Sequence, residues 1–384
     1  MIKSERQFLN HKFNQNYRVS YVLRRVPCQR IVNLIPASSP PKVGDLAMAM
    51  ITDIGKTAKI EMATGRMGLL YKGEPIAVVF GHRYATAQFE GYADMRAENK
   101  CDLLSSGGVC GVVKSKHEAT PQPTRLQILG YLADAEKKSL NLSEFSMKPV
   151  SFNNRDRWPC VIAVCGGSMD SGKTYTTSGI IHGLVSSGYR VGAGKLTGTA
   201  AGRDSWQLLD AGAFNVYDFV DCGLPSTFRC SLEALHRIFD TITSNLAAQG
   251  AEYIVLEIAD GLLEEETAAL LNSAEFRDRV DGFVYAISDP LASIGGVAHL
   301  QNLGIKPIAL SGRVSQSPLA IQEVEKATAL RCLTFNQLAS GELNSEILAL
   351  RNKRELFQNR IGFLTKSYSQ VQRIVSADRR NGKE

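Results

Sequence analysis

The sequence predicts an α/β fold in which a parallel sheet with helices on both faces follows a small antiparallel β-barrel or sandwich domain. Two observations predict this division of the 384 residues. Residues 31–150 contain short apolar runs separated by glycine and proline, with no convincing helix between them. From Trp158 onward, buried apolar runs alternate with helical stretches, which is typical of βαβ units. The two regions are therefore expected to form separate domains.

Strands are expected in the first region where apolar or alternating runs are bounded by turn residues. These runs are 45–51, 58–62, 68–71, 76–80, 85–92, 109–114 and 126–132. Before them, residues 1–30 are expected to form a basic N-terminal arm. After them, the polar segment 139–156 is the expected linker.

The second domain is expected to span residues 158–350. Its strands are expected at 160–165, 190–195, 216–220, 253–258, 282–287 and 306–310. Its helices are expected at 174–187, 204–211, 231–249, 264–273, 290–303 and 318–328. A last short strand at 332–335 is expected to close the sheet before a basic C-terminal segment, 351–384.

Composition excludes several classes of protein. An apolar content of 44% is too high for a chain that is disordered throughout. The most apolar stretches, such as 161–165 and 254–258, are too short to cross a membrane, so no membrane association is expected. The start MIKSERQFLN has no apolar export signal, and the eight cysteines contain no C-x-x-C pair. We therefore expect reduced thiols and a cytoplasmic location.

Positive charge is concentrated at the two ends of the chain. Residues 1–30 and 351–384 each carry a net charge of +6, which leaves −6 for the rest. Basic ends predict a protein or nucleic-acid partner. Alternatively, the N-terminal segment is a solvated tail, or a docking arm whose aromatic side chains cover a core. The sequence leaves open whether the chain is a monomer or a homodimer.

One complete motif predicts a nucleotide site. Residues 167–174, GSMDSGKT, match G-x-x-x-x-G-K-[ST], directly after an apolar strand and at the start of a helix. Glycines let backbone N–H groups surround phosphate oxygens, and the helix N-terminus favours negative charge. The expected ligand is ATP or GTP. The expected nucleotide-binding residues are Gly167, Ser168, Met169, Asp170, Ser171, Gly172, Lys173, Thr174 and Tyr175.

Two residues of this motif have specific expected roles. Lys173 would neutralise the β- and γ-phosphates, and the Thr174 hydroxyl would bind Mg²⁺. A second G-K-T, at Gly55-Lys56-Thr57, lacks the earlier glycine because position 50 is Met50. We therefore expect only the first to bind phosphate.

Carboxylates follow a buried strand that is expected beside this loop. Glu257 lies within the apolar run 253–258, and Asp260 follows that run after one alanine, Ala259. An unpaired buried carboxylate is costly, so a metal or a charged partner is the expected explanation for Glu257. Both residues are catalytic candidates, and Glu257 is also a candidate Mg²⁺ ligand.

The loop after the strand 190–195 is expected to face the same crevice, since both strands end at the carboxyl edge of the sheet. Lys195 is a catalytic candidate, and Asp204 is a candidate Mg²⁺ ligand or helix N-cap. Thr197, Thr199 and Arg203 are candidates for binding an unidentified acceptor. Asp218 and Asp221, at the end of the next strand, are weaker candidates for the same crevice.

With these residues in view, the second domain resembles a class of phosphate-loop NTPases. GGSMDSGKT after VIAVC, the strand GAGKLTG and the acidic strand end EIADG are similar to the class containing dethiobiotin synthetase, amino-acid kinase-like proteins and the molybdopterin-guanine dinucleotide adaptor protein. The similarity covers about Trp158 to Thr334. It implies nucleotide and Mg²⁺ roles for Lys173, Thr174 and Glu257, and more weakly for Lys195.

Three functions are compatible with these features. The first is a Mg²⁺-dependent, ATP- or GTP-using enzyme that phosphorylates or activates an acceptor. The second is a nucleotide-switched module that binds a protein or nucleic acid. The third is a polynucleotide kinase, because a β domain before a kinase-like domain is similar to the polynucleotide 5′-kinases.

Overall fold

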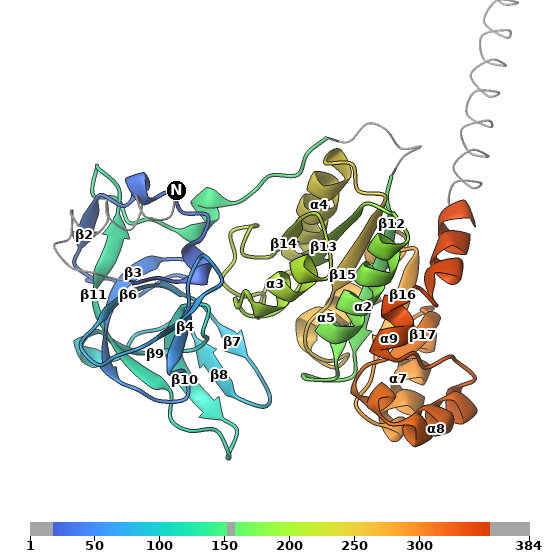
Figure 1. Cartoon of the computed structure of the whole chain (residues 1–384). Helices are drawn as coiled ribbons and strands as arrows, with labels where there is room; N and C mark the ends of the chain where they lie inside the picture. Colours follow the sequence, from blue (N-terminus) through green and yellow to red (C-terminus); the bar gives the residue numbers. More distant parts are fainter. Residues whose placement is uncertain (1–17, 152–157, 354–384) are drawn as a thin grey trace, which may run out of the picture.

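The computed structural model describes residues 18–151 and 158–353 and shows two domains side by side (Figure 1). A β domain comes first, and an α/β domain with a parallel sheet follows it. This is the predicted fold class. No helix in the described residues is long and apolar enough to cross a membrane.

The β domain is built around a closed ring of strands. The ring runs β6-β3-β11-β9-β10, and a β6–β10 pairing closes it into a barrel. Its strands are β3 (Leu46–Asp53), β6 (Pro75–Phe80), β9 (Lys100–Leu103), β10 (Val109–Lys116) and β11 (Thr124–Ala133). Closure satisfies the backbone groups that an open sheet would leave at its edges. Of the predicted alternatives, the domain is therefore a barrel.

Shorter strands extend or flank this ring. They are β1 (Arg18–Val19), β2 (Asn33–Ile35), β4 (Lys59–Glu61), β5 (Met67–Leu69), β7 (Arg83–Tyr84) and β8 (Phe89–Tyr92). Most pairings are antiparallel, as predicted, but β1–β6 and β6–β10 are parallel. The strand expected at 85–92 is β8 alone, with β7 paired to it across a turn.

The α/β domain contains a six-stranded, wholly parallel sheet in the order β14-β13-β15-β12-β16-β17. The strands are β12 (Cys160–Gly166), β13 (Val191–Lys195), β14 (Val216–Asp218), β15 (Tyr253–Glu257), β16 (Gly282–Ala286) and β17 (Pro307–Ser311). β12 lies between β15 and β16, so the loop after it leaves the middle of the carboxyl edge. In open parallel sheets, ligands bind at such a position.

Helices cover both faces of this sheet. They are α2 (Lys173–Ser186), α3 (Arg203–Asp210), α4 (Leu232–Ala248), α5 (Glu265–Asn272), α6 (Ala274–Arg277), α7 (Pro290–Asn302), α8 (Pro318–Thr328) and α9 (Phe335–Ala339). Alternate β12 residues enter two different apolar clusters. Val161 and Ala163 pack with α4 to α8, whereas Ile162 and Val164 pack with α2, α3 and α9. Burial on both faces explains why these strands are continuously apolar.

One predicted element is wrong. Residues 332–335 do not form a strand, because only a single bridge joins Cys332 to Leu310. Helix α9 starts at Phe335, and Thr334 caps it in a reciprocal arrangement with Gln337. A strong helix cap ends the extended backbone before a strand can form.

The predicted domain limits meet the structure only in part. Residues 18–30 pack into the protein, and Tyr21 and Leu23 are buried. The first part of the expected linker belongs to the β domain, since Asn141 bridges Asp45 and starts the short helix η4 (Leu142–Phe145). Residues 1–17 and 354–384 lie outside the described residues, so polyanion binding by the basic ends stays a prediction.

The two domains share a hydrophobic core. One cluster of buried apolar side chains runs from Met48 and Val79 of the barrel, through Leu23 and Ala200, to Leu256 of the parallel sheet. Ion pairs lie beside it, and Arg24 contacts Asp218 at 2.7 Å and Asp221 at 2.6 Å. The relative position of the domains is therefore fixed by burial as well as by charge.

Candidate functional site

The phosphate loop joins β12 to α2 at the carboxyl edge of the sheet. Gly172 has a φ of +98°, and a Cβ atom there would lie 2.8 Å from the Cα of Gly312. Only glycine fits both conditions. Helix α2 begins at the next residue, so its unpaired N–H groups face the loop.

Lys173 is buried at the start of α2. Its ammonium donates to the carbonyl of Ser168 at 2.7 Å, across the loop. Burial lowers the pKa of Lys173, and the nearby carboxylates of Glu257 and Asp260 act against this shift. The side chain thus lies between the loop backbone and the acidic end of β15, where phosphate oxygens would meet it.

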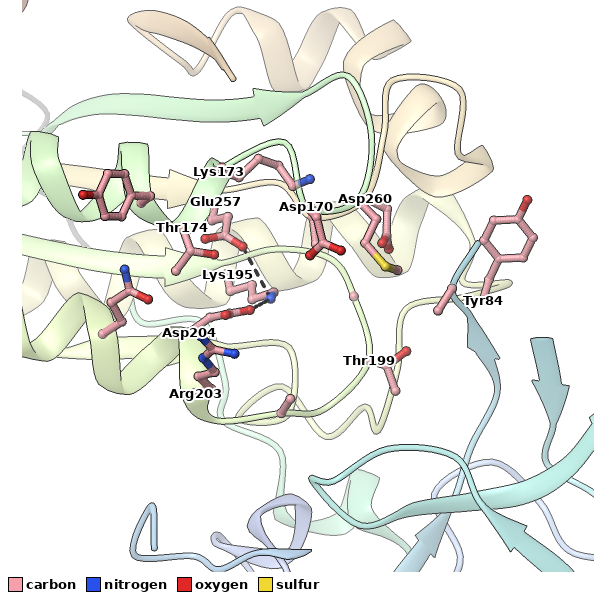
Figure 2. Close-up of a pocket in the computed structure, with 18 of the residues that line it drawn as sticks. Tyr84, Asp170, Lys173, Thr174, Lys195, Thr199, Arg203, Asp204, Glu257 and Asp260 are labelled. Carbon is pink, nitrogen blue, oxygen red and sulfur yellow. Dashed lines mark hydrogen bonds and ion pairs between the residues drawn. The ribbon is translucent and has the colours of Figure 1, made fainter. Parts of the chain in front are cut away.

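Lys195, Asp204 and Glu257 come together from three elements (Figure 2). The Lys195 ammonium, at the end of β13, forms an ion pair with Asp204 in the first turn of α3. The same Nζ lies 3.4 Å from Oε1 of Glu257, at the end of β15. β13 and β15 are paired in register at these residues, which places the two side chains next to each other.

The charges of Lys195, Asp204 and Glu257 shift one another's pKa. Burial opposes ionisation of Asp204, but the Lys195 ammonium outweighs burial and lowers the pKa of Asp204. Burial raises the pKa of Glu257, and Lys195 acts against that shift. Burial also favours neutral Lys195, yet the two carboxylates raise the pKa of its ammonium. Lys195 therefore stays charged and holds both acids at the cavity wall.

The residues present fit Mg²⁺. Oε2 of Glu257 is buried and has no hydrogen-bond partner among the described residues. The Thr174 hydroxyl lies near this carboxyl and favours its ionised form. Mg²⁺ prefers a few protein oxygens, completed by water and phosphate. Among the described residues, no three or more His, Cys, Asp or Glu side chains are grouped so that they could hold a metal ion.

Asp260 lies where β15 leads into the next loop. Its φ is +63°, a left-handed conformation that is uncommon outside glycine. Burial raises the pKa of Asp260, and Lys173, Lys195 and Arg83 act against the shift. The following residue, Gly261, packs so closely on the phosphate loop that an added Cβ would lie 2.7 Å from the carbonyl oxygen of Gly167.

The other predicted nucleotide-binding residues divide between two cavities. Those on the larger cavity, of about 500 Å³, are Met169, Asp170, Gly172, Lys173, Thr174 and Tyr175. A second cavity of about 160 Å³ is lined by Gly167, Ser168 and again Met169. Ser171 is fully buried and lines neither. The Tyr175 ring packs on Phe335, with 4.3 Å between the ring centroids.

The candidate acceptor residues lie at different depths. Thr199 and Arg203 line the larger cavity. Thr197 is buried and does not line it, because its hydroxyl donates to the carbonyl of Ala259 at 3.3 Å. Thr197 therefore ties the loop after β13 to the loop after β15.

The β domain also contributes to the larger cavity, which the sequence did not predict. Arg83, Tyr84 and Ala85, at β7 and the turn after it, lie opposite the phosphate loop. Figure 2 shows Tyr84 reaching the site from a strand of this domain. The polar turn GHRY at 81–84 was a visible signal, but nothing local connects it to the phosphate loop. Arg313, after β17, and Gln207, on α3, also line the cavity.

Asp218 and Asp221 are not part of the site. Tyr21 donates to Asp218 at 2.8 Å, and Arg24 forms ion pairs with both carboxylates. Neither carboxylate lines the cavities described above. These acids hold the two domains together, which is a structural role that their position after a strand did not reveal.

No protein-family model and no curated protein matches the sequence. Solved structures show a distant likeness. The signal recognition particle 54 kDa protein from Aeropyrum pernix, in complex with GDP, is 22% identical with a TM-score of 0.33, over 56% of this chain and 52% of that one. The receptor FtsY from Elizabethkingia anophelis is 17% identical with a TM-score of 0.31, over 54% and 63%.

A DUF1611 family protein from Anabaena variabilis is 14% identical with a TM-score of 0.35, over 58% of this chain and 64% of that one. This chain thus spans between half and two thirds of the length of each of these structures. Identities and TM-scores at this level indicate no more than a remote likeness of fold.

Proposed function

We propose that this protein is a Mg²⁺-dependent enzyme that uses ATP or GTP to phosphorylate or activate an acceptor. The observation that carries the proposal is the position of Lys173. Its ammonium bonds across a complete phosphate loop and lies close enough to the ion-paired Lys195 and Glu257 to interact with both charges. A structural glycine turn would need neither the buried lysine nor the carboxylates around it.

Each residue has a role in this proposal. The loop backbone and Lys173 would bind the β- and γ-phosphates. Thr174, Glu257 and Asp204 would hold Mg²⁺. When bound, the ion neutralises phosphate charge. Lys195 would orient both carboxylates, as it does through its two ion pairs.

These groups would support transfer of the γ-phosphoryl group to an acceptor. An acceptor oxygen would form a bond to the γ-phosphorus, while the bond from that phosphorus to the bridging oxygen breaks and the nucleoside diphosphate leaves with the electron pair. A hydroxyl acceptor would release its proton to Asp260, whose raised pKa suits a proton acceptor, and a carboxylate acceptor would release none. Thr199 and Arg203 would contact the acceptor at the cavity wall.

Nucleotide binding by a lysine variant tests the proposal. We expect Lys173→Ala to weaken binding of MgATP or MgGTP, whichever the wild type prefers, by at least about tenfold, because a buried cation facing the phosphates is lost. Lys56→Ala is the matched control, since Lys56 belongs to the incomplete G-K-T motif and is exposed. Titration calorimetry with each nucleotide measures both variants. Equal affinities of wild type and Lys173→Ala would refute the proposal.

A nucleotide-switched binding module is the second candidate, and contacts from the β domain favour it. The Ser105 hydroxyl donates to the carbonyl of Ala200 at 2.9 Å, and Glu61 accepts from the backbone of Gly202 at 2.7 Å. Both hydrogen bonds join the β domain to the loop after β13, so a nucleotide-dependent movement of this loop would be transmitted to the β domain. Tight nucleotide binding with very slow hydrolysis that a partner accelerates would favour the switch over the enzyme.

A further inference from the structure

Arg83 is held in place by the β domain at the edge of the larger cavity. The short strand β7 pairs it with Gly91 of β8. One guanidinium nitrogen donates to the carbonyl of Leu104, and the other terminal nitrogen donates to Gln88 at 2.9 Å. These contacts fix the guanidinium before any ligand arrives, and Arg83 is one of the residues that line the cavity.

This cation has no ion pair within the described residues. Burial lowers the pKa of Arg83 to about 10, and only the more distant Asp260 acts against that shift. Its Nε is shielded from solvent and has no hydrogen-bond partner among the described residues. Arg24 shows the contrast, because two carboxylates within 2.7 Å neutralise it. Arg83 is thus a half-buried arginine without an ion pair among the described residues, and it lines a cavity that could admit an anion from outside the chain.

The position of Arg83 separates this anion from the nucleotide. Phosphates at the loop would be neutralised by Lys173, by the N-terminus of α2 and by Mg²⁺. Arg83 comes from the opposite domain, and its neighbour Tyr84 lines both the larger and the second cavity. Tyr84 packs on Phe228, with 5.2 Å between the ring centroids, so this wall is preformed. Tyr84, but not Arg83, lines the second cavity, whose volume of about 160 Å³ has room only for a small molecule, so a ligand that contacts both residues would lie between the two cavities.

We propose that the β domain completes the acceptor site, and that Arg83 binds an oxyanion of a small acceptor, either a carboxylate or a phosphate, whose body lies against Tyr84. The inference rests on the proposed function, because it places the acceptor beside a bound nucleotide. It adds the class of acceptor and a specificity-determining residue outside the α/β domain. A planar guanidinium can donate paired N–H hydrogen bonds to the oxygens of either a carboxylate or a phosphate.

The test uses the full chain, loaded with Mg²⁺ and the non-hydrolysable imido analogue of the preferred nucleotide. Inorganic phosphate and succinate are titrated separately by calorimetry, so that the two arms distinguish the oxyanions. We expect at least one probe to bind with a dissociation constant of about 1 mM. Arg83→Gln should weaken that binding at least about tenfold and leave nucleotide affinity within about twofold. Arg66→Gln, at an exposed arginine of the same domain, should change neither.

Arg83→Lys distinguishes a loss of binding from a loss of folding, because it keeps the positive charge but removes the paired N–H donors of the guanidinium. It should bind the probe more weakly than wild type while unfolding at a similar temperature. The proposal is overturned if neither probe binds the loaded protein, if both Arg83 variants bind like wild type, or if they lose nucleotide affinity as Lys173→Ala does. Probe binding by Lys173→Ala without nucleotide, and its loss in the double variant with Arg83→Gln, would support the Arg83 site even where nucleotide binding fails.

Discussion

Two glutamates near the end of β15 lie in different electrostatic surroundings. Glu257 is buried against the Lys195 ammonium, which acts against the rise in pKa that burial causes. Glu264 is partly buried and faces Glu266, and both burial and this neighbour raise the pKa of Glu264 to about 8. Both effects favour the protonated form of Glu264, which lines the second cavity.

This difference predicts how stability depends on pH. The pKa of Glu264 rises from its usual 4.5 to about 8 on folding, so its contribution is fully present below pH 4.5 and is lost as the pH rises through 8. Glu264→Gln removes the titration and keeps an oxygen to accept from the Thr267 N–H. After allowance for solvent screening, we expect the variant to be more stable than wild type by on the order of 1 kcal/mol at pH 9.

Chemical unfolding at pH 4 and pH 9 measures this effect, and the gain at pH 9 should disappear at pH 4. Glu265→Gln, at the exposed neighbouring position, is the control and should shift stability equally at both pH values. A gain for Glu264→Gln that is the same at both pH values would contradict the assignment.

At the scale of elements, helix α3 depends on the β domain for its N-terminal cap. Its N-cap residue, Gly202, has no side chain to accept hydrogen bonds. The Glu61 carboxylate supplies the missing acceptor. It accepts hydrogen bonds from the Gly202 N–H at 2.7 Å and from the Trp206 indole at 2.8 Å. A carboxylate also suits the positive end of a helix. Since α3 carries Arg203 and Asp204, this cap positions residues of the candidate site.

We therefore expect Glu61→Ala to lower the free energy of unfolding by about 2 kcal/mol, because the buried Gly202 N–H and the partly buried Trp206 indole lose their acceptor. It should also weaken nucleotide binding, since Asp204 would lose its fixed position against Lys195. Denaturant titration and calorimetry measure the two effects, and Glu118→Ala, at an exposed site of the same domain, is the control. A stability loss with unchanged nucleotide affinity would show that the cap serves folding alone.

The elements that could be predicted from the sequence are those with local signals. Buried parallel strands are continuous apolar runs, and the phosphate loop lies within a single stretch, so both were recognisable. β9 was missed because Lys100–Leu103 is short and begins with a polar residue. Arg83 was missed for a different reason: its place opposite Asp260 depends on how two domains pack, which no periodicity or spacing encodes.

Across the whole molecule, the contact between domains is part of the core. The cluster around Leu23 and Ala200 is continuous from barrel to sheet, so we expect the described residues to unfold in a single transition. Charge reinforces it, because Arg24 lies between Asp218 and Asp221. The sequence predicts two domains and, as one alternative, an N-terminal arm that docks on a core, but it does not predict that this core is shared by both domains.

Removing Arg24 should therefore be costly. Arg24→Ala leaves buried Asp218 without its cation and Asp221 with only the longer contact to Arg25, and we expect a loss of about 3–5 kcal/mol in the free energy of unfolding. Arg25→Ala is the matched control, because Arg25 is more exposed and reaches Asp221 only at 3.5 Å, so its loss should be below about 1 kcal/mol. Urea unfolding compares them, and similar losses would contradict the role given to Arg24.

The docked segment 18–30 also has a consequence for how such proteins can evolve and be dissected. Cutting the chain at the polar stretch before Trp158 would expose the apolar surface around Ala200 and leave Asp218 and Asp221 without their arginine. Neither half is therefore an autonomous module that recombination could transplant alone. We therefore expect the two domains to be inherited together, and the smallest fragment suitable for expression to contain both.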